Sequence, residues 1–186
     1  KKKIKVKSIA PKEIKHMPWR GHLGTNLTPQ LIPIIKKSKS TLIFTNTRSQ
    51  CELWYQNLLD KMPELAGDMA MHHGSIDRNI RLWVEDAIRN EKIKVVVCTS
   101  SLDLGVDFHP VESIVQVGGP KGVARFVQRA GRSGHRPNQV SKIYFLPTHA
   151  IELIESAALS KAVKKDFVEQ RSPYLLSFDV LIQFLV

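Results

Sequence analysis

The sequence has little cysteine and no long apolar run. Its two cysteines, Cys51 and Cys98, form no C-x-x-C pair that would indicate a zinc site or a redox motif. No apolar run approaches the roughly 18 residues that a membrane-spanning helix needs, and the first residues lack the apolar core of a signal peptide. We therefore expect a cytoplasmic protein with two buried free thiols and no membrane partner.

Several catalytic patterns are absent as well. The chain has no Gly-x-x-x-x-Gly-Lys-Ser/Thr phosphate loop and no Asp-Glu pair to hold Mg²⁺ and position a water. It has no nucleophile–base pair of the kind that a small-molecule α/β enzyme uses. The chain opens on a lysine and stops at Val186 inside an apolar segment. We expect it to be part of a longer polypeptide that supplies what is lacking.

Acidic residues are scarce in two parts of the chain, although the formal net charge of the whole is +11. Residues 1–48 contain 12 lysines and arginines and one acid, Glu13. Residues 113–150 contain six basic residues and no acid. Clustered positive charge favours a polyanionic partner, most simply nucleic acid or nucleotide phosphate. Lys1, Lys2 and Lys3 by themselves are more typical of a solubilising tail.

Short apolar strands alternate with helices along the chain. Residues 1–20 suit an edge strand or connector, and Thr28 and Pro29 indicate a helix start. The remaining strands are expected at 41–45, 68–72, 94–98, 113–117 and 140–146, and the remaining helices at 47–62, 77–90, after Lys121, and at 149–164. The pattern predicts an α/β fold, a parallel sheet with helices on both faces. Functional residues then belong in loops at the carboxyl ends of the strands.

The apolar faces of three helices can be assigned from their spacing. We expect these inward-facing positions: Leu53, Trp54, Leu58 and Leu59 in 47–62; Ile80, Trp83, Val84, Ala87 and Ile88 in 77–90; Ile151, Ile154, Ala158 and Leu159 in 149–164. We divide the chain into a basic connector at 1–27, a main domain at 28–165, and a linker with the first helix of a further unit at 166–186.

The stretch from Gln128 to Arg136 is the most distinctive in the sequence. It follows a helix whose apolar face is Val123, Phe126, Val127 and Ala130 and whose opposite face is Lys121, Arg125, Gln128 and Arg132, with Arg129 at the edge. Gly131 and Gly134 permit a tight turn there, which would aim Arg132 and Arg136 from a fixed base. Arginine suits phosphate because its planar fork matches the oxygens. A solvated basic helix end is the alternative.

Two loops that follow strands could bind anions. Thr45, Asn46, Thr47 and Arg48 stand where a strand gives way to a helix N-terminus, whose free N–H groups attract phosphate. Simple capping by Thr47 would also explain them. In the loop from Thr99 to Asp107, Thr99 and Ser100 could bond a phosphate, Gly105 permits close approach, and Asp107 could accept from a ribose hydroxyl. An ordinary loop with Asp103 as a cap is the alternative.

The pair His72 and His73 precedes Gly74 and Ser75. Adjacent residues of a strand point to opposite faces, and no carboxylate or cysteine is spaced to complete a zinc site. We expect no metal site in this chain.

Taken together, these motifs resemble the second RecA-like domain of superfamily 2 helicases. Leu42 to Arg48 is similar to motif IV, Val97 to Asp107 to motif V, and Gln128 to Gly134 to motif VI. With His72 to Ser75 in the same order, the set is similar to the Lhr-type proteins. The stretches Pro18 to Leu23 and Pro147 to Ser160 resemble the bacterial ligase-associated DExH-box branch most. The resemblance covers about residues 15–186.

The resemblance implies an ATP site completed by a preceding RecA-like domain of the same polypeptide, which would hold Mg²⁺ as well. Arg132 would reach the γ-phosphate together with His135 or Arg136, because His135 stands where many members have arginine. Gln128 and Arg129 would contact the nucleotide or the opposite domain, and Gly105 and Asp107 would face the ribose. The nucleic-acid backbone would follow these residues: Thr45, Asn46, Thr47, Arg48, His73, Gly74, Thr99, Ser100 and Lys121.

The expected function is that of one part of an ATP-dependent helicase or translocase acting on nucleic acid, most simply DNA, in DNA repair. The family branch adds a DNA ligase or nuclease as a candidate partner, and the segment after Arg171 would begin a winged-helix domain. Alone, the chain should be inactive as an ATPase. The alternative is a non-enzymatic nucleic-acid-binding module that uses the same basic zones.

Overall fold

The computed structural model describes residues 4–11, 23–103, 111–134 and 140–169, together with 178, 182 and 183. Within these residues it has one sheet in which every strand runs parallel to its neighbours, in the order β1-β6-β5-β2-β4-β3. The strands are β1 (Ile4–Ser8), β2 (Thr41–Phe44), β3 (Met69–His72), β4 (Val95–Cys98), β5 (Ser113–Val117) and β6 (Ser141–Leu146). The predicted α/β class is confirmed.

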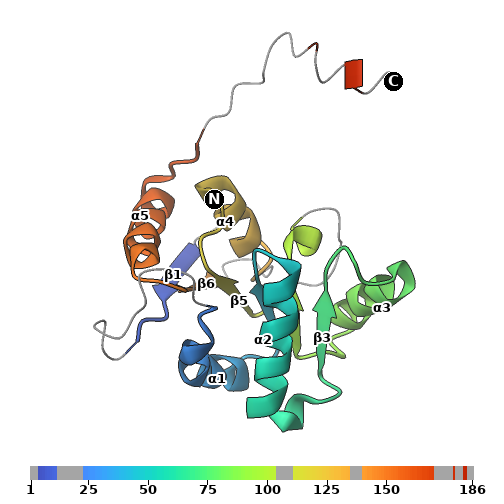
Figure 1. Cartoon of the computed structure of the whole chain (residues 1–186). Helices are drawn as coiled ribbons and strands as arrows, with labels where there is room; N and C mark the ends of the chain where they lie inside the picture. Colours follow the sequence, from blue (N-terminus) through green and yellow to red (C-terminus); the bar gives the residue numbers. More distant parts are fainter. Residues whose placement is uncertain are drawn as a thin grey trace.

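Within the described residues, four α-helices connect strands, a fifth follows the last strand, and together they cover both faces of the sheet (Figure 1). They are α1 (Thr28–Lys37), α2 (Arg48–Lys61), α3 (Arg78–Arg89), α4 (Val123–Ala130) and α5 (Ile151–Lys165), with short 3₁₀ turns at Thr25–Leu27, Pro63–Leu65 and Ser100–Leu102. Strands β2 to β6 begin and end within one residue of their predicted positions, and β1 is an edge strand inside the predicted range 1–20. A run of four or five apolar residues flanked by polar loops is enough to identify a strand that is buried on both faces.

Two apolar clusters, one on each face, hold the helices to the sheet. Successive residues of a strand contribute to opposite clusters. Ile43 packs with Leu31 of α1 and Trp54 of α2, whereas Leu42 packs with the helices of the other face. That second cluster includes Val84 of α3, Phe126 of α4 and Leu159 of α5. Most of these side chains are fully buried, so both faces of the sheet are dry.

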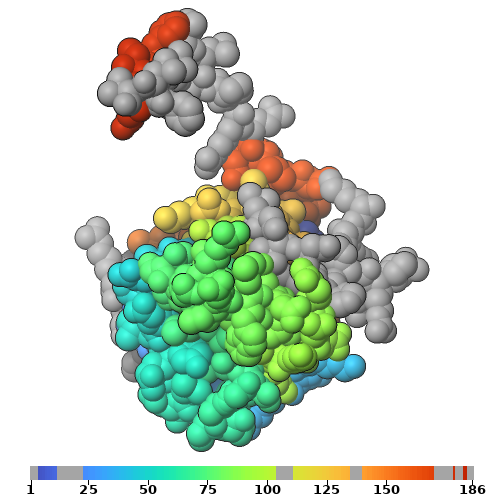
Figure 2. Space-filling view, turned by 90° about the vertical axis from the view of Figure 1, so that its right-hand side faces the viewer, coloured from blue at the N-terminus to red at the C-terminus, as the bar shows by residue number. Residues whose placement is uncertain are grey.

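The helix faces predicted from apolar spacing are wrong in part. In α3, Ile80 and Trp83 are 54% and 60% exposed, and the helix packs through Val84, Ala87 and Ile88. Helix α3 packs over β3, the edge strand of the sheet, so no further strand covers the side chains of Ile80 and Trp83. The helix forms part of the surface that faces the viewer in Figure 2. Leu53 of α2 is also exposed.

The register of α5 is rotated from the expected one because polar side chains occupy its buried face. Ile151 and Ile154 are 53% and 73% exposed, whereas Glu152 and Ser156 are buried with Leu159. The Glu152 carboxylate accepts hydrogen bonds from Thr148 and the backbone of Gly119, and the Ser156 hydroxyl lies 2.5 Å from that of Ser8. Buried polar groups that find partners inside the fold do not follow an apolar pattern.

The start of α1 also differs from the prediction. A 3₁₀ turn precedes this helix, and α1 begins at Thr28 itself. The N-cap residue is therefore Leu27 and not Thr28. The buried Thr28 hydroxyl bonds the Thr25 carbonyl and the side chain of Asn57, which ties α1 to α2. Pro33 is accommodated within the helix.

Candidate functional site

Four polar loops gather at one edge of the sheet. They follow the carboxyl ends of β2, β3, β4 and β5, and because these strands are parallel neighbours, the loops lie side by side. Backbone hydrogen bonds join them directly: Thr45 N–H donates to the Cys98 carbonyl and Thr99 N–H donates to the His72 carbonyl. We call this the carboxyl edge. It collects most of the residues that the sequence nominated for phosphate contact.

The loop after β2 is organised by side-chain hydrogen bonds. Thr45 is fully buried, and its hydroxyl lies 3.2 Å from the carbonyls of Thr47 and Cys98. Asn46 donates to the Gly119 carbonyl at 2.8 Å, which fixes this loop to the one after β5. Thr47 caps α2 by accepting from the Gln50 amide. The capping interpretation of Thr47 is therefore confirmed, while exposed Thr47 and Arg48 still face solvent at the helix N-terminus.

Arg48 connects α2 to the loop after β3. Its guanidinium donates to the Ser75 hydroxyl at 2.9 Å and pairs with Glu52 one helical turn later at 3.7 Å. The imidazole of His73 lies 3.6 Å from the same Glu52 carboxylate and accepts from the Ser75 amide. Burial lowers the pKa of His73 from its usual value. The ring is therefore mainly neutral at pH 7 and acts as a hydrogen-bonding group.

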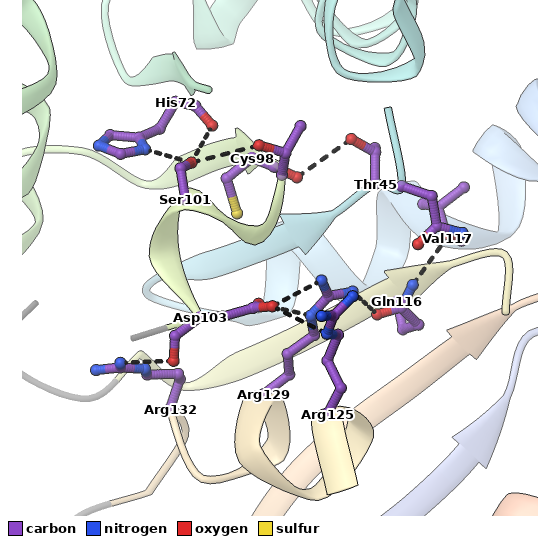
Figure 3. A network of polar contacts seen from close by, with 12 residues as sticks. Thr45, His72, Cys98, Ser101, Asp103, Gln116, Val117, Arg125, Arg129 and Arg132 are labelled. Atoms are coloured by element: carbon purple, nitrogen blue, oxygen red, sulfur yellow. Dashed lines mark hydrogen bonds and ion pairs between the residues drawn. The ribbon is translucent and has the colours of Figure 1, made fainter. Parts of the chain in front are cut away.

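His72 points to the other side of the sheet from His73, as expected for adjacent strand residues. It is buried, and its Nδ1 lies 2.7 Å from the Ser101 hydroxyl (Figure 3). Its Nε2 lies 3.1 Å from a Glu85 oxygen. The Ser101 hydroxyl donates to the His72 backbone carbonyl at 2.9 Å while its oxygen lies beside Nδ1, and the Glu85 carboxylate can accept from Nε2–H. Burial lowers its pKa, against the raising effect of Glu85. This network stiffens the loop from Thr99 to Ser101, whose hydroxyls also contact each other.

Arg129 is the most unusual side chain of the site because it is a fully buried cation. Its guanidinium donates to both carboxylate oxygens of Asp103, at 2.7 and 3.1 Å, and to the Gln116 side chain at 2.5 Å (Figure 3). The same group lies over the Phe44 ring, 4.7 Å from its centroid. The expectation placed Arg129 at the edge of α4, in contact with the nucleotide or the opposite domain. The structure gives it a bidentate partner inside the domain.

Asp103 holds two further arginines besides Arg129. Its carboxylate pairs with Arg125 at 3.5 Å, and its backbone carbonyl accepts from Arg132 at 2.8 Å (Figure 3). The last turn after β4 is thereby tied to the helix and turn that carry the arginines. Arg132 is partly exposed, while Arg129 is not. Of the two, only Arg132 keeps a side chain that can reach an external phosphate.

The end of α4 follows the prediction at one glycine and differs at the other. Gly134 has a φ of 62°, the left-handed region that glycine tolerates, whereas Gly131 is in ordinary helical conformation. Ser133, between them, donates its hydroxyl to the Ala130 carbonyl and pairs with Val111 as an isolated bridge. The turn is thus fixed to the sheet on both sides, and Arg132 starts from a rigid base.

The N-terminus of α4 is capped from a distant part of the chain. The Glu169 carboxylate accepts from the amides of Val123 and Ala124 at 3.1 to 3.3 Å. Gly122 has a φ of 130°, and a Cβ there would collide with that carboxylate. Lys121, which was predicted to contact the nucleic-acid backbone, is exposed and has a φ of 59°. The positive end of the helix is therefore neutralised by this chain's own acid.

Three nominated residues, Gly105, Asp107 and Arg136, lie outside the described residues, as does His135. The structure brings the others to the carboxyl edge or to α4, where Gln128 is exposed. The sequence did not single out Gln116 or give Asp103 its role as an arginine partner. A polar residue inside an otherwise apolar strand, as Gln116 is in β5, was the available signal, because such a group needs a buried partner.

No group of three or more His, Cys, Asp or Glu side chains in the described ranges could hold a metal ion. Asp103 and Glu152, the buried carboxylates nearest the carboxyl edge, already accept several hydrogen bonds each. None of the helices within the described ranges is long and apolar enough to span a membrane.

Comparison with known proteins identifies the class. Residues 25–136 match the helicase conserved C-terminal domain. Over 164 residues the chain is 35% identical to the ATP-dependent helicase Lhr-Core protein 2 of Thermococcus barophilus, covering 88% of this chain and 19% of that protein. It is 29% identical over 200 residues to the Lhr helicase/uracil glycosylase of Escherichia coli, covering 92% and 13%. It spans about a fifth or less of the length of these curated relatives.

Among solved structures, the Mycobacterium smegmatis helicase Lhr bound to ssDNA and AMP-PNP superposes with a TM-score of 0.88 at 26% identity, covering all of this chain and 25% of that one. The chain therefore belongs to the helicase conserved C-terminal domain family, and it is similar to Lhr-type helicases. The predicted resemblance to Lhr-type helicases is confirmed, as is the RecA-like fold. The closer likeness to the ligase-associated branch stays a prediction.

Proposed function

We propose that this chain acts as the second RecA-like domain of an ATP-driven helicase or translocase that moves along nucleic acid, most simply DNA. The observation that carries this proposal is the meeting of four polar loops at the carboxyl edge, one of which also bonds Arg132 of the turn after α4. A domain built this way offers hydroxyls, amides and a cation to phosphates but no groups for the attacking water. The rest of the ATP site would come from an N-terminal RecA-like domain of the same polypeptide.

Arg132 is the side chain that we assign to the ATP phosphates. In the structure its guanidinium donates to the Asp103 carbonyl, a neutral acceptor. A phosphate brought up by a second domain would offer a charged acceptor, and charge-assisted hydrogen bonds are roughly twice as strong as neutral ones. Exchange of the carbonyl for the phosphate would then close the two domains around ATP, and hydrolysis would release them.

Arg129 serves a supporting role in this proposal. With its three hydrogen bonds to Asp103 and Gln116, it fixes the orientation of α4 relative to β5 and to the turn after β4. Arg136, or His135, remains the candidate for a second contact to the γ-phosphate, and Gly105 and Asp107 remain the candidates for the ribose. These assignments rest on the motif resemblance.

The nucleic-acid strand is placed along the exposed tops of the loops after β2, β3 and β4. Four residues are exposed there: Thr47, Arg48, Gly74 and Ser100. Contacts from such residues to phosphate oxygens carry no information about the base sequence. Binding would be insensitive to sequence and sensitive to salt. The M. smegmatis helicase Lhr is bound to ssDNA in its solved structure, which supports DNA as the polymer. A role in DNA repair, with a ligase or nuclease as partner, follows the family branch alone.

Mg²⁺ would accompany ATP in such an enzyme, where it would neutralise phosphate charge. The described residues of this chain do not fit the metal, because their buried carboxylates at the carboxyl edge are engaged. We assign Mg²⁺ to the other domain and give it no contact here.

The test is nucleic-acid-stimulated ATP hydrolysis by the longer protein that contains this chain, with Arg132→Ala beside the unaltered protein. Loss of an arginine that stabilises the transferring phosphoryl group costs about 10³ or more in turnover. ATP binding should change much less, because other groups hold the ground state. Arg89→Ala, an exposed arginine in the last turn of α3, is the matched control and should retain full turnover.

A variant Arg132→Ala that kept half of its turnover would remove Arg132 from this role. If hydrolysis were absent or indifferent to nucleic acid in the unaltered protein as well, the non-enzymatic binding module would become the better description.

A further inference from the structure

A second basic feature lies at the opposite edge of the sheet. A hollow of about 370 Å³ opens there between β1, β6 and the C-terminal end of α1. Lysines from three elements line it: Lys5 and Lys7 of β1, Lys37 of α1 and Lys142 of β6. One acid, Glu112, stands among them and pairs with Lys142 at 3.5 Å. We call this the lysine hollow. Nothing in the proposed function uses it.

Strand register explains why the lysines share one face. In the β1–β6 pairing Lys5 lies beside Lys142 and Lys7 beside Tyr144, and parallel partners point to the same side of a sheet. The intervening Ile4 and Val6 pack toward the cluster of α4 and α5. The lysines therefore point to the face that carries α1 and α2, at the point where those helices no longer cover the sheet.

The opposite wall of the hollow adds hydroxyls and an apolar surface. Pro33, Ile34 and Lys37 of α1 line it, followed by Ser38, whose hydroxyl bonds that of Ser113 at 2.7 Å. Tyr144 contributes an aromatic ring that is partly exposed. The hollow thus combines several cations, a hydroxyl pair and one aromatic ring. Sites that bind single-stranded nucleic acid without sequence preference combine backbone-tracking cations with stacking rings.

A simpler explanation exists for some of these lysines. An edge strand is kept from pairing with other chains by lysines, and Lys36 and Lys37 complement the negative end of the α1 dipole. Neither effect requires lysines of different elements to surround one concave space, or a tyrosine in the register position beside Lys7. Convergence on a common hollow is what separates a binding site from a solvated edge.

We propose that the lysine hollow is a second contact for the backbone of single-stranded nucleic acid, with a base stacked on Tyr144. The chemistry on the ligand side is a phosphodiester and an adjacent base. The hollow extends from the amino ends of β5 and β6 to Lys7 and Tyr144 within β1 and β6, whereas the carboxyl edge consists of the loops after β2, β3, β4 and β5. It would hold a part of the polymer that has left the main track. This inference rests on the proposed function only in its choice of polymer.

The experiment measures binding of this chain to fluorescein-labelled oligothymidylate of about 30 nucleotides, roughly twice the ~16 that a small domain covers. The hollow variant is Lys5→Gln with Lys37→Gln. Its matched control is Lys61→Gln with Lys92→Gln, which removes the same charge from exposed positions, one of them again the last turn of a helix. Arg48→Gln serves as the variant of the carboxyl edge. Thermal unfolding confirms that each variant is folded.

We expect the hollow variant to bind about tenfold more weakly near 50 mM salt, and its plot of log affinity against log salt to be shallower by about 1.4, twice the ~0.7 for each phosphate of a single strand. The control should keep the slope of the unaltered chain. Tyr144→Leu should weaken binding about fivefold or more with its slope unchanged, because stacking does not release counterions.

Equal slopes for the hollow variant and the control would overturn the lysine hollow as a nucleic-acid site. If Arg48→Gln still weakened binding in that case, the proposed function would stand. A hollow effect without an Arg48 effect would support this inference and count against the backbone grip at the carboxyl edge. Binding of inorganic phosphate or a polyglutamate peptide that depends on Lys5 and Lys37, without any binding of oligothymidylate, would refute nucleic acid as the ligand.

Discussion

At the scale of single residues, the ion-pair cluster around Asp103 dominates the site. A buried guanidinium is costly unless every donor is met, and here two carboxylate oxygens, an amide oxygen and an aromatic face meet it. Removal of one partner leaves the other charge buried without compensation. The cost then far exceeds that of breaking an ion pair on the surface.

The first prediction at this scale concerns Asp103→Asn. It should lower the free energy of unfolding by about 3 kcal/mol or more, because Arg129 keeps its charge in a dry site. Asp86→Asn is the control, since Asp86 pairs with Arg89 at 4.0 Å on the exposed side of α3 and should cost less than about 1 kcal/mol. Urea unfolding of both variants measures the difference. Similar losses would show that Asp103 does not carry a buried charge.

The second prediction at this scale is a pH dependence set by His72. Burial lowers its folded-state pKa below the ordinary value of 6.5, so the unfolded chain binds a proton that the folded chain refuses. Stability is therefore complete above the ordinary pKa and falls as the pH drops below it, with a slope of at most about 1.4 kcal/mol per pH unit for one group. His73, whose pKa is lowered too, adds to the same trend.

His72→Gln should flatten this dependence between about pH 7 and pH 5 without abolishing it, because His73 remains. Chemical unfolding at several pH values measures the slope. The prediction is wrong if the variant and the unaltered chain lose stability in parallel.

At the scale of elements, the tryptophans of two consecutive helices, which lie on opposite faces of the sheet, have different environments. Trp54 of α2 is fully buried and its indole N–H donates to the Leu23 carbonyl at 2.9 Å, whereas Trp83 of α3 is 60% exposed. Trp54→Ala should cost about 3–5 kcal/mol of stability, the scale for removing a large core side chain. Trp83→Ala should stay within about 0.5 kcal/mol. Equal melting temperatures for the two variants would contradict the orientation of α3.

The elements also show how far the sequence could lead. Strands β2 to β6 could be located because each is a short apolar run, and the loops at their ends could be named because parallel strands deliver them to one edge. The buried face of a helix could be predicted only where the buried side chains are apolar. Glu152 and Ser156 took the inner face of α5, and Ile151 and Ile154 were displaced outward, since hydrogen bonds from Thr148, Gly119 and Ser8 satisfy the polar pair.

The polar network of the site was beyond the sequence for a related reason. Asp103 and Arg129 are 26 positions apart, and Gln116 is 13 from Arg129. Spacing within one helix placed Arg129 at the border of its polar face. Only the packing of α4 against β5 and the turn after β4 decides whether such an arginine faces solvent or a buried carboxylate.

At the scale of the whole molecule, positive charge is divided between the two ends of one sheet. The carboxyl edge carries arginine and hydroxyl groups on rigid loops, whereas the lysine hollow carries ammonium groups on longer, mobile stems. Arginine provides directional bonds to a phosphate, and lysine provides charge with little directional demand. The chain is thus equipped for an oriented contact at one end and a permissive contact at the other.

The cap that Glu169 provides to α4 has a mechanical consequence. Two amides of the helix that bears Arg125 and Arg129 are bonded by Glu169, so the short stretch from Asp166 to Glu169 ties the end of α5 to the arginine helix. A force on Glu169 therefore reaches α4 through these hydrogen bonds as well as α5 through the covalent chain. The eight-residue helix α4 is therefore held by Glu169 at its N-terminus, while Arg132, just after its C-terminus, contacts Asp103. A displacement of Glu169 would act on the same helix that positions Arg132.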